Sequence, residues 1–588
     1  MKMPSFSEAV NLIRRNEIGR GAAIDTPFGR RLLCYADLTA TGRYLQMVER
    51  WIQSLQPFYA NTHTAVSSTG RIMTHLREDA RRVVGRSVNA GPNDVVLFVG
   101  AGATAAVNKL VGLLGLRVSD ALEREHSLTQ HIPRQQRPVV FVGPYEHHSN
   151  ELPWLESVAE VVEIDLDASG RIDLSDLERK LNRFAARPLK VGAFSAASNV
   201  TGVLTDVRAV ARVLHQGGAF ACFDYAAAAP YLPIYMYPTE SESIDALVLS
   251  THKFMGGPSG SGILVAHRNL FRCHTPERPG GGTVDYVAAF EKVSVDYAHR
   301  LDEREEGGTP AIAGDIRAGL AFLVREMVGP NRILEHELQM SEQAVQRLSR
   351  HPKIRVLGPT QLPRLAIVSF NVEGLHHDLV SALLDHLFGI QNRAGCSCAG
   401  PYGHRLLQIA RTQSELYRKQ IARGFLGIKP GWVRLSLPYY ASAQDLEFIF
   451  KAVEFVADHG IDFVPAYCLG WLDGVWRYRE PSPEPRASAA LDVDSLQRFA
   501  VDSAAEADAR FLSDDELEAE RARYFDEAHR IAAKLRARWA VEPPRWNVPT
   551  GRPEIDSLIW FQYVHCDDPF GAEAATATFT RGAAAGPS

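Results

Sequence analysis

Residues 250–262 read STHKFMGGPSGSG, and this stretch decides the expected fold. It follows IDALVLS, an apolar run with the length and branching of a buried strand, so Lys253 is expected where that strand ends. A lysine there is either a solvated charge or an amine held in a pocket to form a Schiff base. Ser250, His252 and the glycines that follow favour the pocket, because glycine lets the backbone approach a bulky ligand closely.

The chain around this stretch alternates predicted strands with predicted helices. Such alternation indicates βαβ units, so we expect an α/β fold with a mostly parallel, seven-stranded sheet. The predicted strands are DVVLFVG (94–100), RPVVFVG (137–143), VAEVVEID (158–165), VGAFS (191–195), AFACFD (219–224), ALVLS (246–250) and SGILVAH (261–267).

The sequence also indicates how the rest of the chain is organised. We expect an N-terminal helical arm (1–30), a large domain (31–320), a smaller α+β domain (321–465), and a linker with a helical extension (466–588). The linker is PSPEPRAS (481–488), and a capping box of Ser513 and Glu516 opens a predicted amphipathic helix at 514–539. The last residues, GAEAATATFTRGAAAGPS, are expected to be disordered.

Bulk composition bounds the partners and the compartment. The formal net charge of the 588 residues is −5, which gives no basic footprint for nucleic acid. No apolar run is long enough to span a membrane, and charges near the N-terminus argue against a signal peptide. Seven cysteines are too few and too odd in number for a disulfide framework, so we expect reduced thiols and a cytoplasmic protein.

Polar residues follow the predicted strands at the edge where open α/β sheets bind ligands. These residue types suit a phosphorylated pyridine aldehyde, and they predict a site for pyridoxal phosphate (PLP). They are Gly102, Ala103, Thr104, His147, Asn199, Asp224, Ser250, His252 and Lys253.

Each of these residues has an expected role. The helix N-terminus at 102–104 would bind the phosphate with its free N–H groups, helped by Ser250 and His252. Asp224 would keep the pyridine nitrogen protonated, and Lys253 would hold the aldehyde as the internal aldimine. His147 would stack on the ring, and Asn199 would bind O3′ or orient the substrate.

Two alternatives compete with this interpretation. Residues 100–105 fit the dinucleotide fingerprint G-x-G-x-x-A, which requires a strand ending in an acidic residue about twenty residues further on; here the following helix runs into the hydrophilic linker 118–137 instead. Taken singly, each polar residue at a strand end could instead be a turn former or a cap. What favours a cofactor site is that they follow several strands at one edge of the sheet.

The motifs EHHSN with Trp154, SNVTG, FDYA and STHK resemble the class V aminotransferase-fold PLP enzymes, specifically the group II cysteine desulfurases and selenocysteine lyases. The resemblance covers about residues 30 to 460. It implies PLP fold type I and a homodimer. It also implies that the second subunit contacts the cofactor phosphate near Gly307-Gly308-Thr309, which points to Thr309.

The resemblance also implies roles for residues further along the chain. RAGCSCAGPYGH (393–404) is similar to the loop that carries the catalytic cysteine, which falls on Cys398, with Cys396 an additional thiol and Arg393 a nearby positive charge. WVRLSLPYY (432–440) is similar to the segment whose arginine binds the substrate carboxylate, which falls on Arg434. The C-x-C pair has no second pair to complete a zinc site, so no metal is expected.

The chain departs from the family pattern in two places. Ala227 stands where the family has a glutamine that contacts O3′ of the cofactor, so tuning of the ring must differ or come from elsewhere. Residues 405–431 form an insertion that we expect over the site, where it would gate access or change the substrate.

These expectations lead to a functional hypothesis. L-Cysteine would react with the cofactor while Arg434 holds its carboxylate, Lys253 would shuttle the Cα proton, and the Cys398 thiolate would take the sulfur, leaving alanine and a persulfide for an acceptor protein. If Cys398 is only a loop residue, the same machinery would serve an aminotransferase, a selenocysteine lyase, or a β-lyase or epimerase. A catalytically silent scaffold is the alternative from another class.

Overall fold

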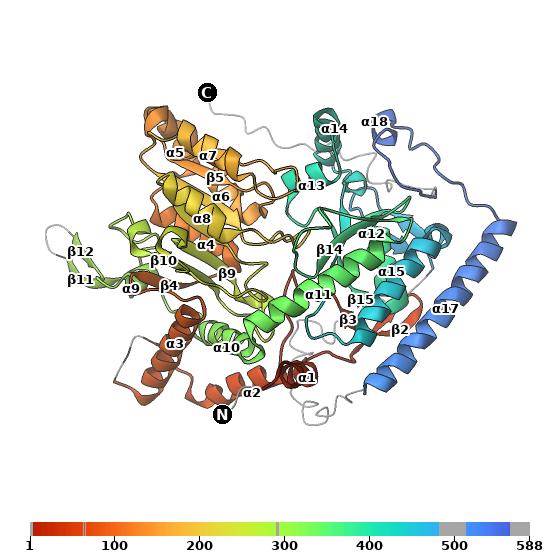
Figure 1. Cartoon of the computed structure of the whole chain (residues 1–588), viewed down its shortest axis with the longest axis horizontal. Coiled ribbons are helices and arrows are strands. Elements are labelled where there is room, and N and C mark those ends of the chain that lie inside the picture. Colours follow the sequence, from red (N-terminus) through yellow and green to blue (C-terminus); the bar gives the residue numbers. More distant parts are fainter. Residues whose placement is uncertain (1–3, 63, 65, 290–292, 481–512, 565–588) are drawn as a thin grey trace.

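A computed structural model describes residues 4–62, 64, 66–289, 293–480 and 513–564, and Figure 1 shows its arrangement. At its centre lies a seven-stranded sheet in the order β4-β10-β9-β8-β7-β5-β6. The strands are β4 (Asp94–Val99), β5 (Val139–Val142), β6 (Glu160–Glu163), β7 (Lys190–Ser195), β8 (Phe220–Asp224), β9 (Ala246–Ser250) and β10 (Gly262–His267). The predicted linker at 481–488 and the tail at 571–588 lie outside the described residues.

The sheet is mostly parallel, as the sequence predicts. Pairs β6-β5, β5-β7, β7-β8 and β8-β9 are parallel, whereas β10 runs antiparallel to both β9 and β4. Alternate residues of each strand face different cores: Leu97 and Val248 pack with α4 (Gly102–Leu113) on one face, and Phe98 and Leu249 pack on the other. Both faces are therefore buried, which explains why these strands read as continuous apolar runs.

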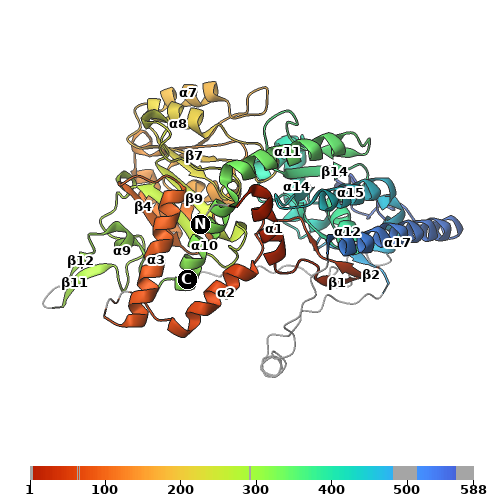
Figure 2. The same ribbon diagram turned by 60° about the horizontal axis from the view of Figure 1, so that its bottom comes forward.

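Helices cover the sheet on both sides, with α4 on one face. On the face of the larger core, the long helix α3 (Ser68–Ser87) packs along α10 (Ile312–Val328) (Figure 2). The other helices and hairpins of this part are α5 (Asp120–His126), α6 (Leu152–Leu155), α7 (Leu174–Arg183), α8 (Val207–Gln216), α9 (Leu301–Glu305), and the hairpin of β11 (Val284–Ala289) and β12 (Val293–Tyr297).

A four-stranded antiparallel sheet in the order β13-β14-β17-β16 forms the second part of the molecule. Its strands are β13 (Ile354–Val356), β14 (Ile367–Val372), β16 (Arg393–Gly395) and β17 (Trp432–Ser436), accompanied by α11 (Pro330–Ser349), α12 (His377–Phe388) and α15 (Ala443–Phe463). The N-terminal arm contains the expected helix α1 (Phe6–Asn16) and leads into a hairpin of β1 (Ala23–Thr26) and β2 (Gly29–Leu32). After the arm come β3 (Cys34–Tyr35), which pairs in parallel with β15 (Ile390–Gln391) of the second part, and α2 (Gln46–Leu55).

The extension is the helix α17 (Asp514–Val541), which lies along α15 and α12 at the outer edge of the molecule (Figure 1). The capping box of Ser513 and Glu516 that the sequence predicts is present. Beyond α17, a short helix α18 (Pro553–Asp556) and Trp560 return to the second part, where the Trp560 ring stacks on His377. The extension therefore packs on its own chain.

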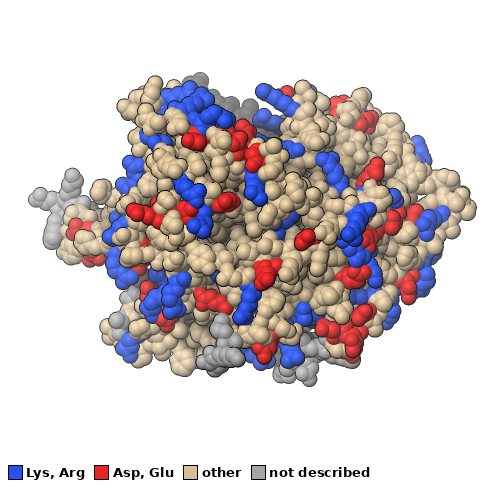
Figure 3. Space-filling model, in the orientation of Figure 1, with Lys and Arg blue, Asp and Glu red and all other residues tan. Residues whose placement is uncertain are grey.

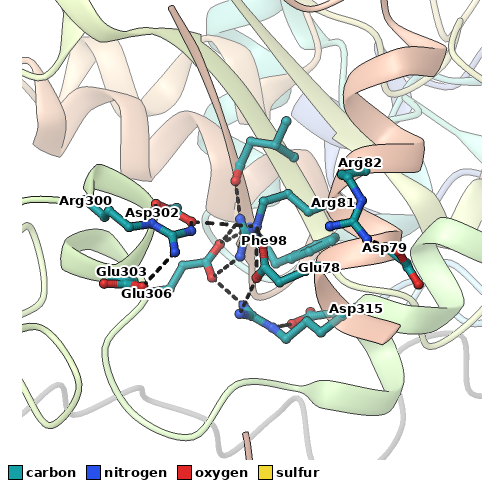
Figure 4. A network of polar contacts seen from close by, with 12 residues as sticks. Glu78, Asp79, Arg81, Arg82, Phe98, Arg300, Asp302, Glu303, Glu306 and Asp315 are labelled. Carbon is teal, nitrogen blue, oxygen red and sulfur yellow. Dashed lines mark hydrogen bonds and ion pairs between the residues drawn. The ribbon is translucent and has the colours of Figure 1, made fainter. Parts of the chain in front are cut away.

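A buried ionic network braces the end of the sheet beside α4 (Figure 4). Arg77 and Arg81 of α3 both bind the carboxylate of Glu306, and Arg77 also binds Asp315 of α10. Glu306 accepts a hydrogen bond from the backbone N–H of Phe98 on β4 at 2.7 Å. The network therefore fixes the strand that leads into α4, and also the segment that leads to Thr309.

Candidate active site

A cavity of about 250 Å³ lies at the carboxyl ends of the parallel strands. It is lined by almost all of the residues that the sequence singles out: Gly102, Ala103, Thr104, His147, Asn199, Asp224, Ser250, His252, Lys253, Arg393, Cys398 and Arg434. Further lining residues that sequence reasoning missed are Thr39, Ala40, Ala101, Ser149, Ser195, Ala197, Ala226 and Ser397. Residues from both parts of the molecule thus meet around one space.

Three residues of the stretch 250–262 line this cavity: Ser250, His252 and Lys253. Ser250 ends β9, and residues 251–253 form a short 3-10 helix that carries Lys253 into the cavity. The glycines serve a different purpose from the one expected, because they do not line the cavity. A Cβ at Gly262 would lie 2.4 Å from the backbone oxygen of Gly102, and one at Gly257 would lie 1.9 Å from that of Thr251, so they permit close backbone packing around the site.

Lys253 and Asp224 face the same cavity and influence each other electrostatically. Burial lowers the pKa of Lys253 to about 8, and the nearby Asp224 carboxylate partly offsets this. Burial also raises the pKa of Asp224, whose Oδ1 accepts a hydrogen bond from the backbone N–H of Ala226 at 2.7 Å. A lysine with a depressed pKa has more neutral amine at neutral pH, which is the form that attacks a carbonyl.

The N-terminus of α4 forms one end of the cavity. Ser250 Oγ accepts a hydrogen bond from the backbone N–H of Ala103 at 2.9 Å, and the Thr104 hydroxyl bonds that of Ser149 at 2.7 Å. Burial, and after it the positive charge of Lys253, lower the pKa of His252 to about 4, so His252 is neutral at neutral pH. Helix N–H groups and hydroxyls are donors that fit a phosphate group.

His147 is held by a buried carboxyl group beside it in the sequence. Glu146 accepts hydrogen bonds from the backbone N–H of Ser195 at 2.8 Å, from its hydroxyl at 2.6 Å, and from Asn150 at 2.7 Å. Burial raises the pKa of Glu146 to about 7, and burial followed by the charge of Lys253 lowers that of His147 to about 4. Glu146 thereby ties the turn that carries His147 to the end of β7.

Cys398 lies in a tight turn that is clamped to the rim. The backbone N–H of Ala399 donates to Cys396 O at 3.1 Å, and both central residues, Ser397 (φ 49°) and Cys398 (φ 53°), are left-handed. Positive φ at both central positions is typical of a type I′ turn, which favours Asn and Gly, and each non-glycine residue there costs about 1–2 kcal/mol. The turn is held by His148 N–H bonding Cys398 O at 2.8 Å and by Asn199 bonding Ser397 O at 2.8 Å.

Arg434 of β17 reaches the cavity from the second part. It donates to the backbone oxygen of Asn199 at 3.0 Å and to Asp37 Oδ1 at 3.0 Å, while its Nε is buried without a hydrogen-bond partner among the described residues. Asp37 Oδ2 in turn accepts from Arg393 Nε at 3.1 Å. Asp37, which lies two residues after β3, is a residue that sequence reasoning missed.

Three expectations need correction or remain predictions. The insertion 405–431 contributes no side chain to the cavity; its helix α14 (Arg411–Ile421) packs toward the extension, where the Tyr417 hydroxyl bonds Leu558 O at 3.4 Å. Thr309 lies outside this cavity and is exposed, so its expected contact with a second subunit remains a prediction. Cys468 is disulfide-bonded, so the expectation of reduced thiols is wrong for this cysteine.

Ala227 lines the cavity beside Ala226, with no polar side chain where the family has a glutamine.

On the face of the molecule shown in Figure 3, basic and acidic side chains are interspersed. Among the described residues, no helix has both the length and the apolar character needed to cross a membrane.

The chain is similar to several known proteins. A probable cysteine desulfurase of Halalkalibacterium halodurans is 29% identical over 391 residues, covering 66% of this chain and 88% of the relative, and one of Streptomyces coelicolor gives the same values. The apo structure of a cysteine desulfurase from Thermococcus onnurineus NA1 superposes with a TM-score of 0.61 at 26% identity, covering 78% of this chain and 99% of that one.

The crystal structure of the Escherichia coli cysteine desulfurase CsdA shares the fold, with a TM-score of 0.57 at 23% identity, covering 72% of this chain and 94% of that one. The family described as Aminotransferase class-V matches residues 34–449, which is more than half of the chain and includes every element around the cavity. The chain therefore belongs to the class-V aminotransferase family.

Proposed function

We propose that this protein is a PLP-dependent cysteine desulfurase, which converts L-cysteine to L-alanine and leaves the sulfur as a persulfide on Cys398. The observation that carries the proposal is that Lys253, Asp224, Arg434 and Cys398, from four distant segments of the chain, line one cavity. The names of the relatives support it. A class-V family member is expected to use PLP, and the residues present fit that cofactor.

The fit of the cavity to PLP is chemical. When bound, PLP supplies an electron-poor ring that stabilises negative charge at the substrate Cα. Asp224 would bind the protonated pyridine nitrogen of PLP. The positive charge of that nitrogen would in turn favour the ionised carboxylate of Asp224. The Ala103 and Thr104 region of α4, with Ser250 and His252, would bind the phosphate. His147, whose turn Glu146 holds in place, would lie against the ring.

Substrate recognition would depend on Arg434. Its buried Nε–H has no partner among the described residues, and a buried unpaired donor is costly. The carboxylate of an amino acid would accept a hydrogen bond from it, while Asp37 and Asn199 O hold the guanidinium in place. Arg393, which is about half exposed, would add positive charge near the entrance.

Proton transfer and sulfur transfer would then fall to two side chains. Lys253 would move the proton at Cα, because its depressed pKa lies near neutral pH. The thiolate of Cys398 would attack the substrate sulfur, so that an S–S bond forms as the Cβ–S bond breaks and the carbon product leaves as alanine. The position of Cys398 at the cavity favours desulfuration over transamination, racemisation or β-elimination, none of which needs a thiol there.

The assay is the release of alanine and sulfide from L-cysteine in the presence of a thiol reductant. The Cys398→Ser variant should lose most activity, whereas Cys273→Ser, which alters a free cysteine away from the cavity, should keep it. Equal turnover by wild type and Cys398→Ser would disprove the persulfide route. The same assay with L-selenocysteine as substrate tests the lyase alternative, because a selenocysteine lyase would keep its activity in the Cys398→Ser variant.

We also propose that the protein works as a homodimer in which Thr309 serves the site of the second copy. The exposed Thr309 and the hairpin β11–β12, which projects from the body (Figure 1) and exposes Tyr286 and Val287, support this. Sedimentation should give twice the chain mass, and Thr309→Ala should weaken PLP uptake without dissociating the dimer. A monomer with full PLP uptake would contradict the proposal.

After desulfuration, a sulfur-acceptor protein would remove the persulfide sulfur from Cys398.

A further inference from the structure

A second thiol shares the turn that carries Cys398. Cys396 and Cys398 are residues one and three of the turn closed by the hydrogen bond between Cys396 O and the N–H of Ala399. The proposed function uses Cys398 alone. Of the other free cysteines, Cys34 and Cys222 are buried, and Cys273 lies beside Gly112.

The distance between the two cysteines along the chain is short enough for a direct reaction. Residues two apart are separated by at most about 7 Å between Cα atoms, and a tight turn shortens this. A disulfide needs a Cα separation of about 4.4–6.8 Å. The turn therefore keeps the two Cα atoms within the separation that a disulfide requires.

The environments of the two thiols differ in a way that suits two roles. Cys398 is exposed and lines the cavity, whereas Cys396 is half-buried, packs against the hydrophobic core, and does not line the cavity. Substrate sulfur in the cavity would thus meet Cys398, and Cys396 is two residues before it in the same turn. Hydrogen bonds from His148 and Asn199 hold the backbone of this turn in place.

We infer that Cys396 is a resolving cysteine that releases the sulfur as sulfide. The Cys396 thiolate attacks the inner sulfur of the Cys398 persulfide, a Cys396–Cys398 bond forms, and the outer sulfur leaves with the electron pair as hydrosulfide. The persulfide sulfur is reduced, the two thiols are oxidised to a disulfide, and the thiol proton goes to water or to the hydrosulfide. A dithiol reductant then restores both thiols.

The disulfide closes a very small ring in a turn that is already strained. Strained and exposed disulfides are reduced readily and are the labile ones. A dithiol can therefore reduce the Cys396–Cys398 disulfide to two thiols, so that the enzyme can turn over again. This inference rests on the proposed function, since it requires the Cys398 persulfide.

A single turnover with less than one equivalent of L-cysteine and no other thiol tests the inference, because excess cysteine would itself attack the persulfide. Wild-type protein loaded with PLP should release sulfide equal to the alanine formed. After alkylation and digestion, the peptide that contains both cysteines should have the mass of an internal disulfide. Cys396→Ser should still form alanine, but it should release about tenfold less sulfide until dithiothreitol is added, and its peptide should carry one extra sulfur.

The controls separate this inference from the proposed function. Cys273→Ser should release sulfide as wild type does, and Cys396→Ala repeats the test if the serine variant does not fold. Equal sulfide release by wild type and Cys396→Ser, or a wild-type peptide that keeps the persulfide, would overturn the resolving role while leaving the desulfurase intact. A lack of alanine from wild type would overturn the desulfurase, and the resolving role with it.

Discussion

Asp37 Oδ1 accepts a hydrogen bond from Arg434 at 3.0 Å, and both side chains are buried. This pair orients the guanidinium that we assign to the substrate carboxylate. Asp37→Asn keeps the shape but removes the charge, so we expect kcat/KM for L-cysteine to fall about tenfold or more, mainly through KM. Steady-state kinetics measures this, with the exposed Asp120→Asn as control. An unchanged KM would show that the pair does not position the arginine.

Lys253 gives a prediction about pH. Burial lowers its pKa to about 8 although Asp224 opposes this, and only the neutral amine attacks an aldehyde. The rate at which cofactor-free protein binds PLP covalently should therefore rise with pH, with its midpoint near pH 8, and level off about one pH unit higher. Absorbance after mixing with PLP follows the reaction, and Lys253→Arg should show no covalent binding.

The Asp224→Asn variant tests the cause of this pKa. Because the Asp224 carboxylate raises the pKa of Lys253, its removal should move the midpoint to lower pH. A wild-type midpoint near the ordinary lysine pKa of about 10.4 would contradict the buried environment.

The rim of the site could be predicted from the sequence because two rules act together. Alternating strands and helices indicate a parallel sheet, and the carboxyl ends of such strands meet at one edge. Asp224 ends β8, and Lys253 lies three residues after the end of the neighbouring strand β9, so their meeting follows from the pattern. Cys398 and Arg434 required the family resemblance, since no periodicity links them to that edge.

Asp37 and Glu146 could not be predicted in the same way. Asp37 reaches Arg434 because β3, only two residues long, pairs with β15 more than 350 residues away. A pairing that short leaves no periodic signal. Glu146 stands beside His147 in the sequence, but nothing in the sequence shows that it is buried. Its hydrogen bonds to Ser195 and Asn150 form only in the folded chain. The insertion packs toward the extension, whose position the sequence does not indicate.

Glu306 yields a stability prediction from the network in Figure 4. Its removal leaves Arg77 and Arg81 short of a buried counter-charge and leaves the Phe98 N–H without its acceptor. We expect Glu306→Ala to lower the free energy of unfolding by about 3 kcal/mol. Glu303→Ala, at an exposed position on the same segment, should change it by less than about 0.5 kcal/mol. Equal effects of the two variants in denaturant unfolding would contradict a structural role for the network.

Tyr524 links the extension to the N-terminal hairpin. Its hydroxyl, on the buried face of α17, accepts a hydrogen bond from the backbone N–H of Leu32 at 2.9 Å. Tyr524→Phe keeps the ring but leaves that N–H without its acceptor, so we expect a loss of about 1–3 kcal/mol in the free energy of unfolding. Tyr235→Phe, at a side chain that is 53% exposed, should have little effect. If thermal unfolding shows no difference between the two variants, the contact between α17 and the hairpin does not stabilise the fold, and the extension must serve another purpose.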